Sequence, residues 1–178
     1  MHYQTMRNQA KSGDVLLVEG QGIVSRLIRA LTGQNISHVA MLLWFGNNLF
    51  VCEMKEFTGY RLRPASLWVD DVLGSGDRLY YGLMPKRWQG NPHDELIGKK
   101  IANAALAYRN RSYSYSTLMS VWWAQITRKK TSAGLVCSTF VQRCWEACGL
   151  EFKQTADPGD YMHLCESTHA IKGASNER

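Results

Sequence analysis

The sequence lacks the patterns that identify metal-binding, membrane-spanning and nucleic-acid-binding proteins. Its five cysteines include no Cys-x-x-Cys pair, and their spacings do not match those of zinc sites. No stretch approaches the roughly 18 apolar residues that a transmembrane helix needs. Basic residues are scattered, and the densest cluster is the triplet Arg128-Lys129-Lys130. We therefore expect no metal or other cofactor, no membrane span and no nucleic-acid partner.

Internal repeats, low-complexity segments and an apolar leader are also missing. Residues 1–12 are polar and lack the apolar core of a signal peptide. An odd number of cysteines without a disulfide pattern favours free thiols in a reducing compartment. We therefore expect a cytoplasmic protein, or a phage-encoded one that is delivered by lysis or with a virion. The sequence does not indicate an oligomeric state.

The composition is that of one globular domain. The chain has 178 residues, of which 45% are hydrophobic and 20% charged. Six tryptophans and eight tyrosines are enough to line a groove as well as fill a core. The net charge of +6 favours contact with an anionic surface, although no basic patch is visible.

Hydrophobic periodicity predicts strands in the first half of the chain and helices in the second. This order is typical of an α+β fold with an antiparallel sheet packed against helices. We expect a flexible lead over residues 1–12, a single domain over 13–165 and a polar tail over 166–178. The expected strands cover residues 15–18, 38–44, 49–54, 60–62 and 78–84, and the expected helices cover 23–31, 92–108, 118–126 and 137–148.

Cys137 is the first candidate for chemistry, because it opens a helix with an apolar stripe. Backbone N–H groups in the first turn of a helix lack intrahelical partners, and the helix dipole is positive there. Both effects favour a thiolate, and the same N–H groups can bind an oxyanion. Cys144 and Cys148 lie on the stripe, where a cysteine usually acts as a small buried hydrophobe.

His38 is the best candidate for a base among the five histidines, since it alone begins a buried strand. If Leu43 pairs with Asn48 in the following hairpin, His38 lies directly opposite Glu53. A carboxylate next to an imidazole fixes its tautomer and stabilises its protonated form. The alternatives are a buried structural histidine and an exposed edge glutamate, and a turn of another length would change the register.

The order of these motifs resembles a known superfamily. Gly13-Asp14 before a strand, Ser37-His38-Val39-Ala40, Val51-Cys52-Glu53 and a distant Val136-Cys137-Ser138-Thr139-Phe140 are similar to the circularly permuted NlpC-type papain-like superfamily. The similarity is greater to the YiiX/YebB-like branch, which includes poxvirus proteins, than to lecithin:retinol acyltransferase-like enzymes. It spans roughly residues 13–162, and it implies a papain-like fold.

The resemblance implies a catalytic role for Cys137 as nucleophile, for His38 as base and for Glu53 as the residue that orients the base. It implies a structural role for Asp14, whose carboxylate would cap the turn before the first strand. Met54 departs from the small residue that the family usually has after the acid. Tyr113 and the unusual pair Trp122-Trp123 are the expected substrate-binding residues. Because successive helical residues point about 100° apart, Trp122 and Trp123 cannot both face one core.

The sequence therefore favours a cysteine hydrolase of the amidase or peptidase type, acting on an acyl-containing substrate such as a cell-wall peptide. One alternative is a lipid or thioester acyl hydrolase, or an acyltransferase, at a membrane surface. A second alternative is a non-catalytic binding domain with the same fold.

Overall fold

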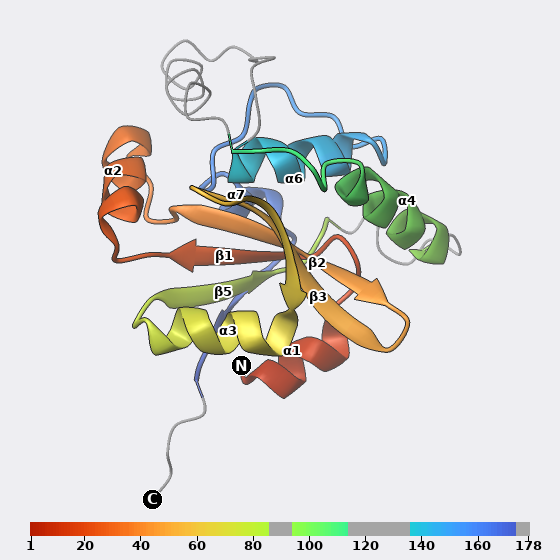
Figure 1. The fold of residues 1–178 in the computed structure, drawn as a ribbon, viewed down its shortest axis with the longest axis horizontal. Helices are drawn as coiled ribbons and strands as arrows, with labels where there is room; N and C mark the ends of the chain where they lie inside the picture. The colour runs from red at the N-terminus through yellow and green to blue at the C-terminus, as the bar shows by residue number, and fades with distance from the viewer. Residues whose placement is uncertain (86–93, 114–135, 174–178) are drawn as a thin grey trace, which may run out of the picture.

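The computed structural model describes residues 1–85, 94–113 and 136–173. At its centre is a six-stranded sheet in which all neighbouring strands are antiparallel, as the sequence predicted (Figure 1). The order across the sheet is β4 (Gly59–Pro64), β3 (Asn48–Lys55), β2 (His38–Phe45), β1 (Val15–Glu19), β5 (Arg78–Gly82) and β6 (Thr168–Ile171).

Both faces of the sheet are covered, which explains the continuous apolar sequence of its central strands. In β1, Val15 and Leu17 pack into one apolar cluster, while Leu16 and Val18 pack into another on the opposite face. Successive side chains of a strand point to opposite faces. An apolar residue at every position is therefore what a strand with two covered faces requires.

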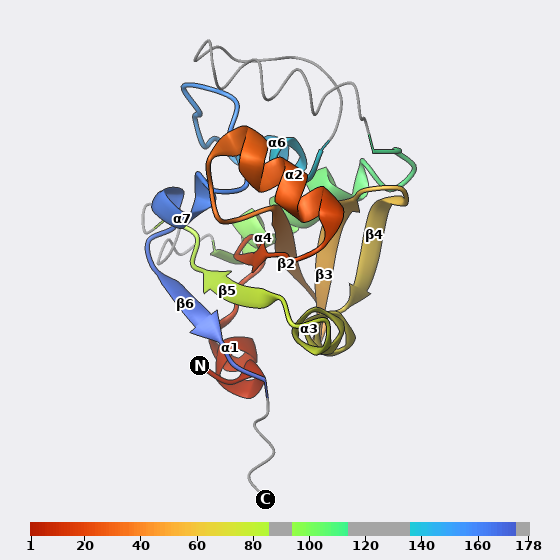
Figure 2. The ribbon, with the colours of Figure 1, turned by 90° about the vertical axis from the view of Figure 1, so that its left-hand side faces the viewer.

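The helices form two layers. The first layer packs on one face and contains α4 (Asp94–Leu106), α6 (Cys137–Glu146) and the short α7 (Tyr161–Leu164). The second layer packs on the other face and contains α1 (Tyr3–Gln9) and α3 (Ala65–Gly74). Figures 1 and 2 show α2 (Ile23–Thr32) at one end of the sheet, between β1 and β2. Among the described helices, none has both the length and the apolar character needed to cross a bilayer.

The hairpin of β2 and β3 is shifted by two residues from the predicted one. We expected Leu43 opposite Asn48, but Phe45 pairs with Asn48. The turn therefore consists of only Gly46-Asn47, and Gly46 is in the left-handed region at φ 57°. A left-handed residue is favourable in a two-residue hairpin turn. Because side chains alternate with a period of two, a shift of two keeps each of them on its predicted face.

Two terminal segments that the sequence predicted to lie outside the domain belong to the fold. Residues 1–12 contain α1, whose Met6 is fully buried, and residues 166–178 contain the edge strand β6. The terminal amine of Met1 donates a hydrogen bond to the Ala170 carbonyl, and the Lys172 amide donates one to the Met1 carbonyl. Each segment buries too few apolar residues to produce a recognisable periodicity, which is why they were missed.

The structure also changes the expected helices. Helix α3 has no counterpart among them, α4 ends at Leu106 and α6 ends at Glu146, two residues before each predicted end. Helix α2 ends at Thr32, one residue beyond its predicted end, and Gly33 follows it in the left-handed region at φ 69°. The predicted helix over 118–126 and the first two residues of the predicted helix over 92–108 lie outside the described residues.

The burial of Met6 predicts that α1 contributes to the stability of the fold. We expect Met6→Ala to lower the free energy of unfolding by about 2–5 kcal/mol, because it leaves a cavity between α1 and the sheet. Urea unfolding followed by circular dichroism measures this change. Thr5→Ala, at an exposed position of the same helix, is the control. Equal stability of the two variants would mean that α1 is not docked in solution.

Candidate functional site

The backbone at the start of β2 holds His38 in place. The preceding residue, Ser37, is buried, and its amide donates a hydrogen bond to the Val18 carbonyl. The Ser37 hydroxyl accepts a hydrogen bond from the Gly20 amide at 3.1 Å and donates one to the Val18 carbonyl at 3.3 Å. His38 then pairs with Val18 as the first residue of the strand. These contacts hold the backbone of His38 at the end of the sheet and thereby fix where its side chain begins.

Glu53 lies diagonally across the hairpin from His38. Continued past its last pair, the register would place Glu53 opposite Ala40, two residues from His38. The two side chains still share a face, and the imidazole Nε2 donates a hydrogen bond to the Glu53 carboxylate Oε2 at 2.7 Å. The predicted direct opposition is therefore wrong, but the predicted contact is present, because long side chains can bridge a diagonal pair.

The surroundings of Glu53 keep its carboxylate charged. Burial alone would raise the pKa of Glu53, but the hydrogen bond and charge of His38 lower it below its usual range. Lys55 and a hydrogen bond from the side chain of Trp68 in α3 lower the pKa of Glu53 further. An indole N–H can only donate a hydrogen bond, so the Glu53 carboxylate accepts from Trp68 as well as from the imidazole of His38.

Cys137 reaches His38 from the opposite layer. It is the first residue of α6, where the Val136 amide donates a hydrogen bond to the Thr139 hydroxyl at 3.0 Å. The side chain of Cys137 interacts with the imidazole of His38. Burial alone would lower the pKa of His38, but its interaction with Cys137, together with Glu53, raises it from 6.5 to about 10. The imidazole thus contacts a thiol and a carboxylate at once.

A second set of contacts holds the start of α6. The Tyr161 hydroxyl in α7 donates a hydrogen bond to the carbonyl of Ser138, the residue after Cys137, at 2.9 Å. Tyr161 follows a turn in which Asp157 and Asp160 each accept a hydrogen bond from the other's amide at 2.9 Å. Burial and the charge of Asp160 raise the pKa of Asp157 to about 6. Through Tyr161, this turn therefore holds the start of α6 against the C-terminal part of the chain.

Asp14 lies at the other end of the sheet and has a different environment. Its carboxylate accepts hydrogen bonds from the Lys11 amide at 2.8 Å, the Tyr81 hydroxyl at 2.6 Å and the Met84 amide at 2.9 Å. These donors come from the turn before β1 and from β5 and the residues after it. The contacts are those that a structural carboxylate would make, because they tie two segments to the start of β1.

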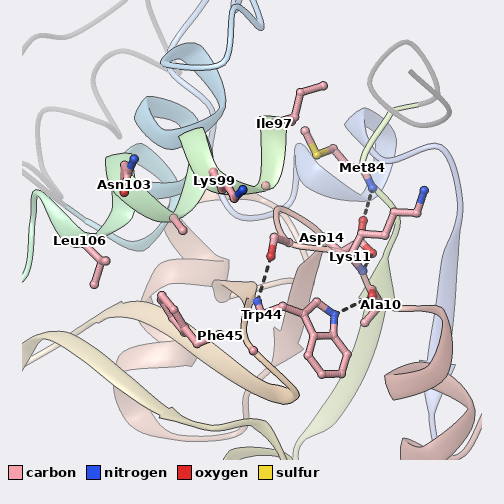
Figure 3. A pocket seen from close by; sticks show the side chains of 14 residues that line it. Ala10, Lys11, Asp14, Trp44, Phe45, Met84, Ile97, Lys99, Asn103 and Leu106 are labelled. Atoms are coloured by element: carbon pink, nitrogen blue, oxygen red, sulfur yellow. Dashed lines mark hydrogen bonds between the residues drawn. The ribbon is translucent and has the colours of Figure 1, made fainter. Parts of the chain in front are cut away.

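A wide hollow lies beside Asp14 and not beside His38. It has a volume of about 810 Å³ and lies between α4, the end of β2 and the segment before β1 (Figure 3). The Trp44 indole, which donates a hydrogen bond to the Ala10 carbonyl, forms part of its wall. A smaller hollow of about 220 Å³ is lined by His38, Glu53 and Trp68 on the α3 side. Size alone therefore does not locate the reactive groups.

The three residues predicted to bind substrate are not among the described contacts of His38, Glu53 and Cys137. Tyr113 is only 8% exposed and packs in the apolar cluster that also contains Cys137. A substrate contact by Tyr113 stays a prediction. Trp122 and Trp123 lie outside the described residues.

Sequence reasoning missed Trp68 and Tyr161, which both contact the site through hydrogen bonds. Neither residue was predicted to contact the three candidate catalytic residues. Trp68 is in the unpredicted helix α3, and Tyr161 follows a recognisable turn, Asp157-Pro158-Gly159-Asp160, that gave no indication of a contact with α6.

The arrangement supplies the groups needed for nucleophilic acyl transfer. A thiol hydrogen-bonded to an imidazole can transfer its proton and become a nucleophile. A carboxylate on the other side of the imidazole stabilises the charged ring. The N-terminus of α6 adds backbone N–H groups that can stabilise an oxyanion near Cys137.

Comparison with known proteins identifies the fold. No protein-family model matches the chain, and no curated protein matches it. A solved structure, metalloprotein yiiX from Escherichia coli O157:H7, is similar with a TM-score of 0.59 and 18% sequence identity. The similarity covers 80% of this chain and 68% of that chain. The chain therefore has a YiiX-like α+β fold, and the similarity by itself assigns no activity.

The neighbouring protein, yiiX, is described as a metalloprotein. Within residues 1–85, 94–113 and 136–173 of this chain, no group of three or more His, Cys, Asp or Glu side chains could hold a metal ion.

The contact between Cys137 and His38 predicts that Cys137 is the most reactive of the five thiols. Burial raises the pKa of the other four, Cys52, Cys144, Cys148 and Cys165. Limiting iodoacetamide followed by peptide mass mapping should therefore label Cys137 first, and His38→Ala should slow this labelling. Faster labelling of Cys148, the one partly exposed thiol, would contradict the assignment.

The raised pKa of His38 predicts a pH-dependent contribution to stability. A histidine with a higher pKa in the folded state stabilises the fold fully below its unfolded pKa, here 6.5. This contribution is lost as the pH rises toward the folded pKa of about 10. We expect wild type to be more stable than His38→Gln in urea at the acidic end of this range, and the difference to shrink toward the alkaline end.

The control for this pH series is His163→Gln, because His163 is exposed in α7. The pH profile of its unfolding free energy should follow that of the wild type. A gap between wild type and His38→Gln that is constant from pH 6.5 to about pH 10 would show that the pKa of His38 is not raised in solution.

Proposed function

We propose that the protein is a cysteine hydrolase of the amidase or peptidase type, with Cys137 as nucleophile. The observation that carries the proposal is the imidazole of His38, which hydrogen-bonds Glu53 and interacts with the Cys137 side chain. A nucleophile, a base and an orienting acid come from three separate segments of the chain and meet at one point.

The proposed reaction has two steps. The Cys137 thiolate attacks the carbonyl carbon of the substrate, and the protonated His38 gives its proton to the leaving amine or alcohol, so that a thioester forms. His38 then takes a proton from water, whose oxygen attacks the thioester. The acid is released and Cys137 regains its proton. Glu53 orients the imidazole and stabilises its positive form in both steps, and the Cys137 amide helps to bind the oxyanion.

The YiiX-like fold supports this proposal, because the motif order resembles that of circularly permuted NlpC-type papain-like enzymes. In those enzymes the histidine precedes the acid and the cysteine follows last, as His38, Glu53 and Cys137 do here. We propose that one such catalytic domain includes residues 13–165, with α1 and β6 packed on it. Peptides of the cell wall are the proposed substrates, either for a cytoplasmic enzyme or for a phage enzyme released by lysis or with a virion.

A lipid or thioester acyl hydrolase, or an acyltransferase, is the second candidate. It would form the same kind of acyl-enzyme. It is favoured by the exposed apolar side chains of Ile23, Leu27 and Phe57, which lie at the same end of the sheet as Cys137. An acyltransferase would pass the acyl group to an alcohol or amine in place of water. A non-catalytic binding domain is less well supported, because such a domain would not need the thiol, imidazole and carboxylate together.

An acyloxymethyl ketone probe tests the nucleophile before the substrate is known. The Cys137 sulfur should displace the probe's carboxylate and form a thioether, which intact-protein mass spectrometry detects and peptide mapping locates. Cys137→Ala should abolish this modification, whereas the matched variant Cys148→Ala should retain it. Modification of the Cys137→Ala variant at the wild-type rate would contradict the proposal.

Turnover should then separate the roles of His38 and Glu53. On whichever amide, ester or thioester is cleaved in a substrate panel, we expect His38→Ala to lower kcat/KM by about 10²–10⁴-fold, because it removes the proton-transfer group. Glu53→Gln should cause a smaller loss, because the amide still fits beside the imidazole but carries no charge. Equal losses with unchanged melting temperatures would mean that these roles are wrongly assigned.

A further inference from the structure

The end of the sheet that holds His38 also carries two protruding elements. Strand β1 ends there and leads into α2, and β3 ends there and turns into β4 through residues 56–58. Helix α6 begins at the same end with Cys137. Figures 1 and 2 show α2 and the start of β4 at this end, next to the beginning of α6. A binding partner that contacts both α2 and the turn at residues 56–58 would therefore also lie close to Cys137.

Helix α2 exposes apolar side chains although it is part of a folded protein. Ile23 is 79% exposed and Leu27, one turn later on the same side of the helix, is 52% exposed. Ile28 is buried and fixes the helix against the rest of the molecule. The sequence of α2 contains no acidic residue, and Arg26 between the two apolar side chains is exposed.

The turn between β3 and β4 exposes a third large apolar side chain. Phe57 at its tip is 80% exposed and has φ 66°, so its backbone is in the left-handed region. Glycine or asparagine adopts this conformation more easily than a bulky residue does. A phenylalanine in this backbone conformation is unfavourable for the turn itself.

The charges around these apolar side chains are mainly positive. Arg109 and Arg111 are exposed just beyond α4, and the Arg111 carbonyl accepts a hydrogen bond from the Tyr60 amide beside the turn. Gly59 passes so close that a Cβ there would lie 2.7 Å from the same carbonyl oxygen. The one acidic residue in the turn, Glu56, is paired with Lys55 at 3.2 Å. Arg26 adds a further positive charge from α2.

We propose that this apolar rim, formed by Ile23, Leu27 and Phe57, docks on a lipid bilayer with anionic headgroups. Apolar side chains interspersed with arginine are typical of elements that lie in the interface of a membrane, where apolar groups enter the acyl region and cations contact phosphate. The bound protein would present the Cys137 end of the sheet to the bilayer. Docking of this kind is a binding property and does not depend on the proposed hydrolase activity.

Vesicle co-sedimentation of the full chain tests the proposal. We expect wild type to sediment with vesicles of phosphatidylcholine mixed with phosphatidylserine, less with phosphatidylcholine alone, and less when salt is raised. Leu27→Asp and Phe57→Asp should each weaken the partition coefficient about tenfold or more, because a charge replaces an inserted apolar side chain. Arg26→Glu should weaken binding to the anionic vesicles only.

Leu67→Asp is the matched control. Leu67 is 55% exposed, close to the value for Leu27, but it belongs to α3, which packs on the face of the sheet opposite to α6. Its substitution should leave vesicle binding unchanged, and all four variants should keep the wild-type melting temperature.

Three results would overturn the docking proposal. One is a wild-type protein that does not bind anionic vesicles at low salt. Another is equal loss of binding in Leu67→Asp and Leu27→Asp. The third is self-association in size-exclusion chromatography that Leu27→Asp abolishes without any vesicle binding, which would make the rim an interface between two copies. The cysteine probe separates membrane docking from the proposed function, because its reaction with Cys137 in solution does not require vesicles.

Discussion

The arrangement of Glu53 and Cys137 depends on the buried imidazole of His38, which interacts with both. Glu53 reaches it from the face that α3 covers, and Cys137 reaches it from the layer of α6. A buried charge is unfavourable unless partners compensate it, and here each partner comes from a different side of the sheet. The two helical layers must therefore be packed correctly before the three groups can meet.

The two ends of the sheet contain buried carboxylates with different properties. Asp14 accepts three hydrogen bonds from neutral donors and holds segments together around β1. Glu53 instead shares its carboxylate with an imidazole that can gain or lose a proton. The difference explains why the larger hollow, which lies beside Asp14, is not the proposed place of the reaction. The partners of a group decide its chemistry more than the size of the neighbouring space.

Three exposed apolar side chains lie at the same end of the sheet as Cys137. Ile23, Leu27 and Phe57 belong to loops and helices that begin or end where His38 and Cys137 lie. A water-soluble peptide substrate needs no such surface, whereas a lipid acyl group would be delivered to the site by it. Membrane docking would thus favour the lipid hydrolase or acyltransferase over the peptidase, with the same three proposed catalytic residues.

The sequence by itself determined the α+β class, the antiparallel sheet and the face on which each residue of β2 and β3 lies, because apolar patterns report which side of a strand is buried. It also singled out Cys137, His38 and Glu53 as residue types suited to one chemistry. Tertiary structure decided the hairpin register, the docking of α1 and β6 and the contacts of Trp68 and Tyr161. These depend on side chains that are distant in sequence and become neighbours only when the layers pack. The contact between Glu53 and His38 survived a wrong register because a shift of two residues preserves the face of a strand.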